Sequence, residues 1–144
     1  MTTEATLPPF CTEDAPHFGV NVPFMKLLGL QAEHMEDGYA RARLPYHSEL
    51  VNSRHDVHGG TLMSVLDFML TAVARSHDPL NVGVATIEMS THFLGVARGD
   101  LIFEANLLKR GRSTAFCEGK VSNANGEPVC VARGTFKLIH HKKA

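Results

Sequence analysis

Hydrophobic and polar positions change their spacing several times along this chain, and each change marks an expected element. Between residues 59 and 77 the chain is apolar on nearly all sides of a helix, because one helical stripe has further apolar neighbours on the opposite face. The stripe and its neighbours are Leu62, Val65, Leu66, Met69 and Val73, with Met63, Phe68, Leu70 and Ala74. Such a helix must be wrapped by other elements. Asp67 is the one acidic side chain within it.

Strand-like patterns lie on both sides of this helix. Two short runs, residues 30–35 and 39–44, flank Asp37-Gly38, a dipeptide that strongly favours a two-residue hairpin. Short connections join antiparallel neighbours, so the strand-like runs after the helix are predicted to form a four-strand meander. These runs are residues 82–94, 101–109, 114–122 and 128–139. A short apolar helix, residues 22–28, is expected to precede the hairpin and to end at Gly29.

This order of elements predicts an α+β domain in which an antiparallel sheet of about six strands curls around one long central helix. A chain of 144 residues suits one domain with a sizeable core and is too short for two ordinary ones. We expect that domain at residues 21–140. Prolines among polar residues predict that residues 1–20 form an arm on the surface or are partly disordered, and residues 141–144 form a basic tail.

Composition narrows the classes of partner. A formal net charge of -1 gives no general reason to expect nucleic acid or an anionic membrane surface. The longest apolar stretch, residues 62–74, is polar at three positions and too short to cross a bilayer. Three cysteines, and a start without a basic and apolar leader, favour reduced thiols in a soluble cytoplasmic protein.

The chemistry that the chain offers is concentrated around the expected central helix. His58-Gly59-Gly60 opens that helix, where the first backbone N–H groups have no intrahelical partner and can bind a developing negative charge. Asp67 follows in mid-helix, among apolar residues. A carboxylate in this position is either a hydrogen-bonded structural residue or a catalytic one.

Asn52, His58-Gly59-Gly60 and Asp67 together resemble the site motif of hotdog-fold acyl-CoA thioesterases of the phenylacetate-degradation type, in the 4-hydroxybenzoyl-CoA thioesterase superfamily. In that family an Asn stands six residues before a His-Gly-Gly, and an Asp nine residues after that His. Both spacings match here, and the resemblance extends over roughly residues 22–139. The chain departs from the pattern at His55, where many members have glycine.

The resemblance implies a role for each matching residue. Asp67 would act as nucleophile or as general base on water, and the Gly59 N–H would polarise the thioester carbonyl. His58 would shape the turn, Asn52 would position the water or the thioester, and Thr86 would supply a hydroxyl that helps to hold water. No metal or redox cofactor is implied, since coenzyme A is part of the substrate.

Helix geometry adds a requirement for a second subunit. Eight residues of helix separate the backbones of Gly59 and Asp67 by about 12 Å, whereas an oxyanion donor and a nucleophile should each lie about 3 Å from the reacting centre. We therefore expect a two-fold homodimer in which Gly59 of one subunit meets Asp67 of the other. Exposed strand edges make a homotetramer a further expectation.

Substrate contacts are expected at two further places. The basic turn Lys109, Arg110, Gly111 and Arg112 is expected to bind the coenzyme A phosphates, as related thioesterases commonly do, although a solvated hairpin tip has the same composition. Gly60, Met63 and Phe68 are predicted neighbours of the thioester and its acyl chain, although the apolar pair also suits plain core packing.

Hydrolysis of a small, medium-chain or aromatic acyl-CoA to the free acid and coenzyme A is the predicted function. One alternative is a hotdog dehydratase or hydratase, which would be expected to use a catalytic His with an acid. The other is a non-catalytic acyl-CoA-binding protein in which Asp67 is structural. His55 and His58 suggest a metal site by spacing alone, but no HExxH or cysteine-rich set accompanies them and none is expected.

Overall fold

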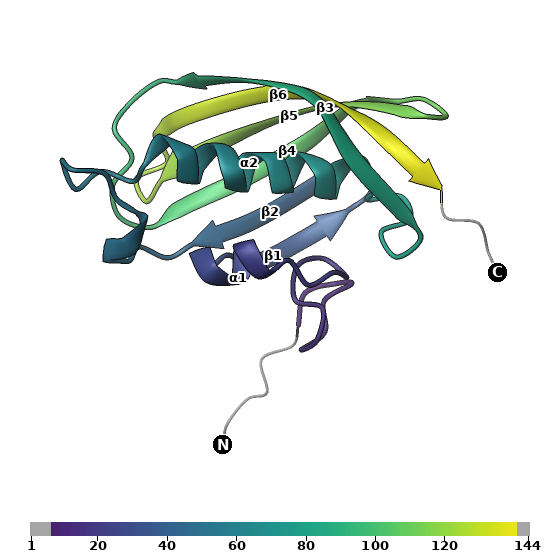
Figure 1. The fold of residues 1–144 in the computed structure, drawn as a ribbon, viewed down its shortest axis with the longest axis horizontal. Coiled ribbons are helices and arrows are strands. Elements are labelled where there is room, and N and C mark those ends of the chain that lie inside the picture. The colour runs from purple at the N-terminus through teal and green to yellow at the C-terminus, as the bar shows by residue number, and fades with distance from the viewer. Residues whose placement is uncertain (1–6, 141–144) are drawn as a thin grey trace.

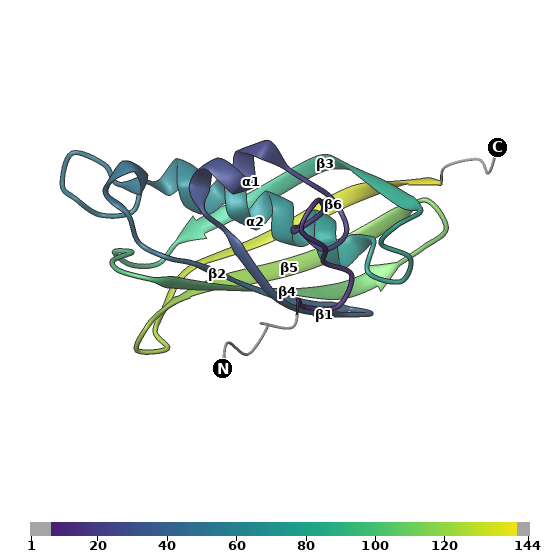
Figure 2. The same cartoon turned by 90° about the horizontal axis from the view of Figure 1, so that it is seen from below.

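One antiparallel sheet and one long helix account for most of the chain in the computed structural model, which describes residues 7–140. The sheet curls around the helix, as Figure 1 shows face on and Figure 2 from below. This confirms the predicted α+β architecture of six strands around a central helix. The elements are α1 (Pro23–Leu28), β1 (Gln31–Glu36), β2 (Tyr39–Leu44), the short 3-10 helix η1 (Ser48–Leu50), α2 (Gly59–Ala74), β3 (Val82–Phe93), β4 (Leu101–Arg110), β5 (Thr114–Asn123) and β6 (Pro128–His140).

Helix α2 supplies the centre of the core. Val65, Leu66 and Met69 are fully buried, as a helix that is apolar nearly all round requires. Strand β5 passes so close beneath it that a Cβ on Gly119 would lie 3.0 Å from Leu70 Cδ2 and 3.0 Å from a β4 carbonyl oxygen. A larger residue at this crossing would require the Leu70 side chain and the β4 backbone to shift.

The strand order is β1-β2-β4-β5-β6-β3, so the predicted four-strand meander is wrong in one respect. Strands β4, β5 and β6 do form a meander, but β3 pairs with β6 at the edge of the sheet and not with β4. Three inter-strand spacings, about 14 Å, separate β3 from β4, and the seven residues 94–100 can span about 23 Å when extended. The connection is short, yet long enough to skip two strands.

Helix α2 also ends earlier than predicted, at Ala74 and not at His77. Its last carbonyl groups are taken by side chains: the Ser76 hydroxyl donates to the Val73 carbonyl oxygen at 2.6 Å, and Arg110 donates to that of Ala74 at 3.1 Å. These contacts close the helix without a further turn.

Part of the N-terminal arm belongs to the core, which corrects the prediction of a surface segment. The Phe18 side chain is fully buried and stacks on Phe68 of α2 with ring centroids 6.2 Å apart. The buried Arg75 guanidinium donates to the carbonyl oxygens of Phe18 and Pro79 at 2.8 Å and to that of His17 at 3.2 Å. Burial lowers the pKa of Arg75 to about 10. Residues 1–6 and the basic tail 141–144 lie outside the described residues.

Replacing Phe18 by alanine should therefore destabilise the whole domain. A deleted core phenylalanine leaves a cavity, so we expect Phe18→Ala to lower the free energy of unfolding by about 3–4 kcal/mol in urea denaturation. Phe10→Ala is the matched control, because Phe10 has the same left-handed backbone (φ 68° against 57°) but is 42% exposed. Equal effects of the two substitutions would show that the arm is not part of the core.

Candidate active site

The start of α2 leaves one backbone donor open. The Gly60 N–H donates to Nδ1 of the His58 side chain at 2.8 Å, so His58 is the N-cap of the helix. The N–H groups of Thr61 and Leu62 donate to the His58 carbonyl oxygen at 2.9 and 3.3 Å. Among residues 7–140 the Gly59 N–H has no partner. An unpaired donor at the positive end of a long helix suits a developing oxyanion.

Neighbouring side chains lie close to both glycines. A Cβ on Gly60 would lie 3.0 Å from His58 Nδ1, and a Cβ on Gly59 would lie 3.2 Å from Cε1 of the Phe93 ring. Phe93 ends β3 and is 53% exposed, so an aromatic edge stands beside the open N–H. Phe93 was not predicted as a site residue, because nothing in its spacing connects it with the Gly-Gly motif.

The structure brings Asp67 together with Thr86. The Thr86 hydroxyl on β3 donates to Oδ1 of Asp67 on α2 at 2.6 Å, and Asp67 is half-buried. This bond orients the carboxylate and leaves its second oxygen without a partner among residues 7–140. Because α2 is continuous from Gly59 onward, the backbones of Gly59 and Asp67 stay about 12 Å apart along the helix within one chain.

Asn52 organises the loop before the helix. Its Oδ1 accepts from the backbone N–H groups of Arg54 at 2.9 Å and Asp56 at 3.2 Å, an Asx turn. The same loop contains His55 at φ 65°, a left-handed conformation that favours glycine. His55 departs from the family pattern in residue type but adopts the turn conformation that glycine would adopt more easily. With its oxygen occupied, Asn52 retains only its amide NH₂ for another group.

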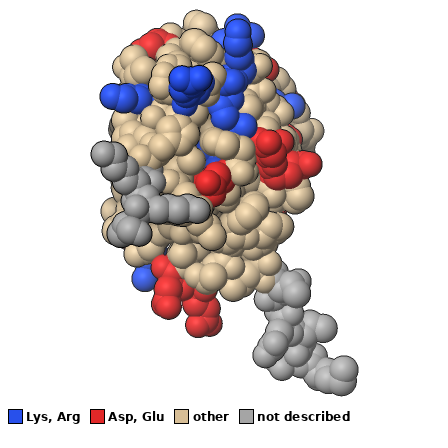
Figure 3. Space-filling model, turned by 90° about the vertical axis from the view of Figure 1, so that its right-hand side faces the viewer, with Lys and Arg blue, Asp and Glu red and all other residues tan. Residues whose placement is uncertain are grey.

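The basic β4–β5 turn divides into inward and outward side chains. Arg110 reaches back to α2: it donates to the Ala74 carbonyl oxygen and pairs with Asp37 at 3.0 Å. Its guanidinium is thus used within the fold, which weighs against the predicted phosphate contact for this residue. Lys109 and Arg112 are exposed, and Gly111 between them makes the turn. Figure 3 views this end of the molecule and shows Lys and Arg side chains gathered on one part of it.

The two predicted apolar neighbours of the substrate lie in different surroundings. Met63 is 42% exposed on the flank of α2, one turn after Gly59. Phe68 is buried against Phe18 and meets the His17 ring edge-on at 6.0 Å. Core packing accounts for Phe68, so Met63 is the one of the pair that a ligand can reach in this conformation.

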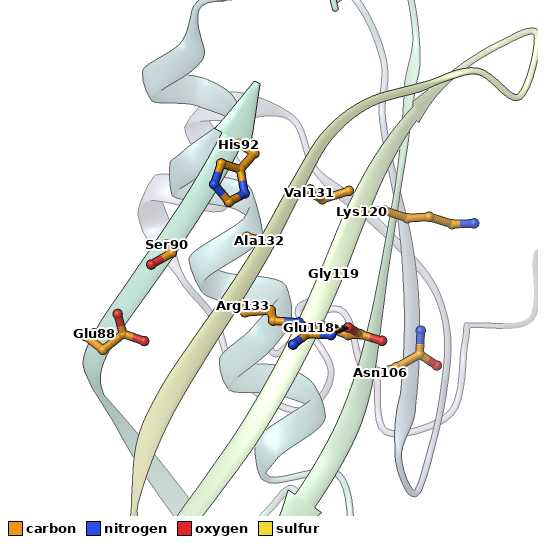
Figure 4. Close-up of a pocket in the computed structure, with 10 residues that line it drawn as sticks. All are labelled: Glu88, Ser90, His92, Asn106, Glu118, Gly119, Lys120, Val131, Ala132 and Arg133. Carbon is orange, nitrogen blue, oxygen red and sulfur yellow. Dashed lines mark hydrogen bonds and ion pairs between the residues drawn. The ribbon is translucent and has the colours of Figure 1, made fainter. Parts of the chain in front are cut away.

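A broad hollow of about 660 Å³ lies on the outer face of the sheet, away from α2. Figure 4 shows its lining of polar side chains, among them Glu88, His92, Glu118 and Arg133. Arg133 and Glu118 form an ion pair at 3.2 Å across it. No residue of the predicted site lines this hollow.

Other reactive groups in the described part of the chain do not form a competing centre. Cys117 and Cys130 are buried, and burial raises their pKa values to about 12 and about 11, so both remain thiols at neutral pH. Within residues 7–140, no three His, Cys, Asp or Glu side chains gather closely enough to hold a metal ion. No helix in the same residues is long and apolar enough to cross a membrane.

Comparison with known proteins identifies the family. Residues 55–130, about half of the chain, match the model of the Thioesterase superfamily. A Halobacterium salinarum protein, provisionally named an esterase, is 35% identical over 126 residues, which cover 80% of this chain and 83% of the relative. Acyl-coenzyme A thioesterase PaaI of Escherichia coli is 25% identical over 116 residues, 79% of this chain and 81% of the relative. The chain belongs to the thioesterase superfamily.

Solved structures share the architecture. A conserved protein of Pseudomonas aeruginosa superposes with a TM-score of 0.78 at 26% identity, covering 83% of this chain and 95% of that one. A Streptococcus mutans protein bound to acetyl-CoA superposes with a TM-score of 0.72 at 19% identity, covering 80% and 92%. The fold is the hotdog fold that the sequence resemblance implied.

The backbone at His55 gives a test of the loop that precedes the site. We expect His55→Gly to change the free energy of unfolding by less than about 1 kcal/mol, because relief of left-handed strain offsets the greater freedom of the unfolded chain. His55→Val should cost about 1–2 kcal/mol, since a branched side chain resists positive φ. Ser53→Val, in the same loop at negative φ, serves as control. Equal stability of the two valine variants would contradict the assigned backbone conformation.

Proposed function

We propose that this chain hydrolyses acyl-CoA thioesters to the free acid and coenzyme A, at a site that two copies build together. The observation that carries the proposal is the pairing of an open N–H at Gly59 with a hydroxyl-oriented carboxylate at Asp67. Coenzyme A thioesters are favoured as substrates because one relative is named an acyl-CoA thioesterase and one structural neighbour holds acetyl-CoA. The proposed acyl groups are small, medium-chain or aromatic.

Each group has a defined task in this reaction. The thioester oxygen accepts from the Gly59 N–H, which stabilises the negative charge that forms as the carbonyl carbon is attacked. Asp67 attacks that carbon directly or removes a proton from a water that does so, and Thr86 fixes the orientation of the carboxylate. The C–S bond then breaks, and the coenzyme A thiolate takes up a proton. Where Asp67 attacks directly, water afterwards hydrolyses the acyl–Asp67 anhydride, which releases the free acid and restores the carboxylate.

The free edge of β3 supports a dimer that completes the site. Among residues 7–140, strand β3 pairs only with β6, so its other edge presents unpaired backbone groups, and Ile87 on it is 59% exposed. Gly59 lies beside Phe93 near the end of β3, and Asp67 is bonded to Thr86 nearer its start. Antiparallel pairing of two β3 edges, centred between Met89 and Ser90, would set Phe93 opposite Thr86 of the partner subunit. The same pairing brings Gly59 toward Asp67 of the partner subunit.

Substitution of the carboxylate tests the catalytic role. We expect Asp67→Asn to reduce thiol release from acyl-CoA substrates by about 10²- to 10⁴-fold, because the amide can neither attack nor take a proton. A panel of short, medium and aromatic acyl-CoAs, followed with a thiol reagent, also identifies the preferred acyl group. Asp14→Asn, an exposed acid on the arm, is the control and should retain full activity.

Two outcomes would contradict this assignment. Equal turnover by wild-type protein and Asp67→Asn would remove Asp67 from the chemistry. Tight acyl-CoA binding without any thiol release by the wild-type chain would instead favour a non-catalytic binding protein with a structural Asp67.

Mixed dimers test the shared site separately. Gly59→Pro removes the open N–H at a first-turn position where proline is tolerated, so it should inactivate without breaking the helix. We expect Asp67→Asn and Gly59→Pro to be inactive alone, while a tag-purified heterodimer regains about half of the wild-type activity, one intact site of two. Inactive heterodimers of verified composition would rule out the shared arrangement.

A further inference from the structure

The loop before α2 contains a buried carboxylate that two arginines share. Asp56 is 7% exposed, and its Oδ1 accepts from Nε of Arg98 at 2.8 Å. The Nε of Arg54 lies 3.7 Å from the other oxygen, Oδ2. One buried acid thus gathers two guanidinium groups from segments far apart in the sequence.

The terminal nitrogens of both guanidinium groups are available to a ligand. Asp56 engages each arginine through Nε, and the terminal nitrogens have no partner among residues 7–140. The side chains of Arg54 and Arg98 are 78% and 74% exposed. Two guanidinium charges against one carboxylate leave a net positive charge, and terminal N–H pairs are the geometry that binds carboxylate or phosphate.

The backbone holds this pair in place. The Asn52 side chain closes the turn that carries Arg54, and the Val57 N–H donates to the Ala97 carbonyl oxygen at 2.8 Å, which ties the two arginine-bearing segments together. His55 accepts a left-handed backbone within the same turn. The loop conformation is therefore determined by several contacts and is retained at a steric cost.

The pair also lies close to the open donor of the proposed site. Asp56 precedes Gly59 by three residues, which limits the distance between their Cα atoms to about 11 Å. An arginine side chain extends this reach outward from the helix start. A substrate with its carbonyl at Gly59 can therefore place a second, negative group at the arginines.

We propose that Arg54 and Arg98, both held by Asp56, bind a negatively charged oxygen group of the thioester substrate that lies at a distance from the thioester carbonyl. That oxyanion is either a carboxylate at the far end of the acyl chain or a phosphate of coenzyme A. The identity of the ligand rests on the proposed function. Within one chain this site is separate from the β4–β5 turn, which Arg110 anchors at the opposite end of α2.

Binding to an inactive background separates the two sources of the anion. In Asp67→Asn protein, calorimetry would measure the affinity for butyryl-CoA, glutaryl-CoA and the pantetheine thioesters of the same two acids, which lack phosphate. We expect Arg98→Gln and Arg54→Gln each to weaken binding about 3- to 10-fold, as for partly solvated charge-assisted contacts. Arg54 has the longer contact with Asp56, so its removal disturbs the loop less if Arg98→Gln fails to fold.

The pattern of loss identifies the anion. Weaker binding of both coenzyme A ligands with unchanged pantetheine ligands assigns the phosphate, and weaker binding of both glutaryl ligands assigns the carboxylate. Arg133→Gln is the matched control, because Arg133 is equally exposed (74%) and paired with an acid on the outer face of the sheet.

Three results would overturn the proposal. The first is a loss of affinity in Arg54→Gln and Arg98→Gln no larger than that in Arg133→Gln. The second is an equal loss of affinity for all four ligands, and the third is that the Asp67→Asn protein binds none of the ligands. Thiol release by the wild-type chain is read separately, so hydrolysis with unaffected binding would reject the arginine site and leave the proposed function standing.

Discussion

A single helix fixes the spacing on which the rest of the site depends. Because α2 runs unbroken from Gly59 to Ala74, it holds the backbone of Gly59, with its open N–H, about 12 Å along the axis from the backbone of Asp67. Its surroundings stabilise the helix: His58 caps its start, Arg110 donates to carbonyl groups at its end, and the sheet covers its apolar sides. A continuous helix cannot bring these two groups to one carbonyl within a single chain, which is why we propose a site shared by two subunits.

The sheet contacts the helix at the same two groups. Strand β3 contacts α2 at both groups of the proposed site, through Phe93 beside Gly59 and through Thr86 on Asp67. With β1 it is one of the two edge strands of the sheet. The strand that contacts both groups is therefore also an edge strand, which is why the proposed dimer is built through it. Because β3 lies at the edge, residues 94–100 must extend past two strands to reach β4. The same residues place Arg98 beside Asp56 in the loop before α2.

Much of this architecture was predictable from the sequence, for identifiable reasons. The spacing of apolar residues predicted α2, and the Asp37-Gly38 turn predicted the first hairpin. The motif spacing predicted that His58 and Gly59 stand together at the start of the helix. The position of β3 was mispredicted because chain connectivity does not determine which strands pair. The burial of Phe18 was not predicted, because Arg75 holds this segment by donating to its backbone carbonyl groups. Contacts to the backbone do not depend on residue type and so leave no pattern in the sequence. The inward turn of Arg110 was missed because a basic turn does not indicate which side chains face the core.

The dependence of specific activity on protein concentration tests the central claim most directly. Thiol release per chain should be constant while the protein is dimeric and should fall in parallel with the dimer fraction, measured by sedimentation, as dilution separates the subunits. Specific activity that stays constant in solutions shown to contain only monomer would contradict a site built from two copies.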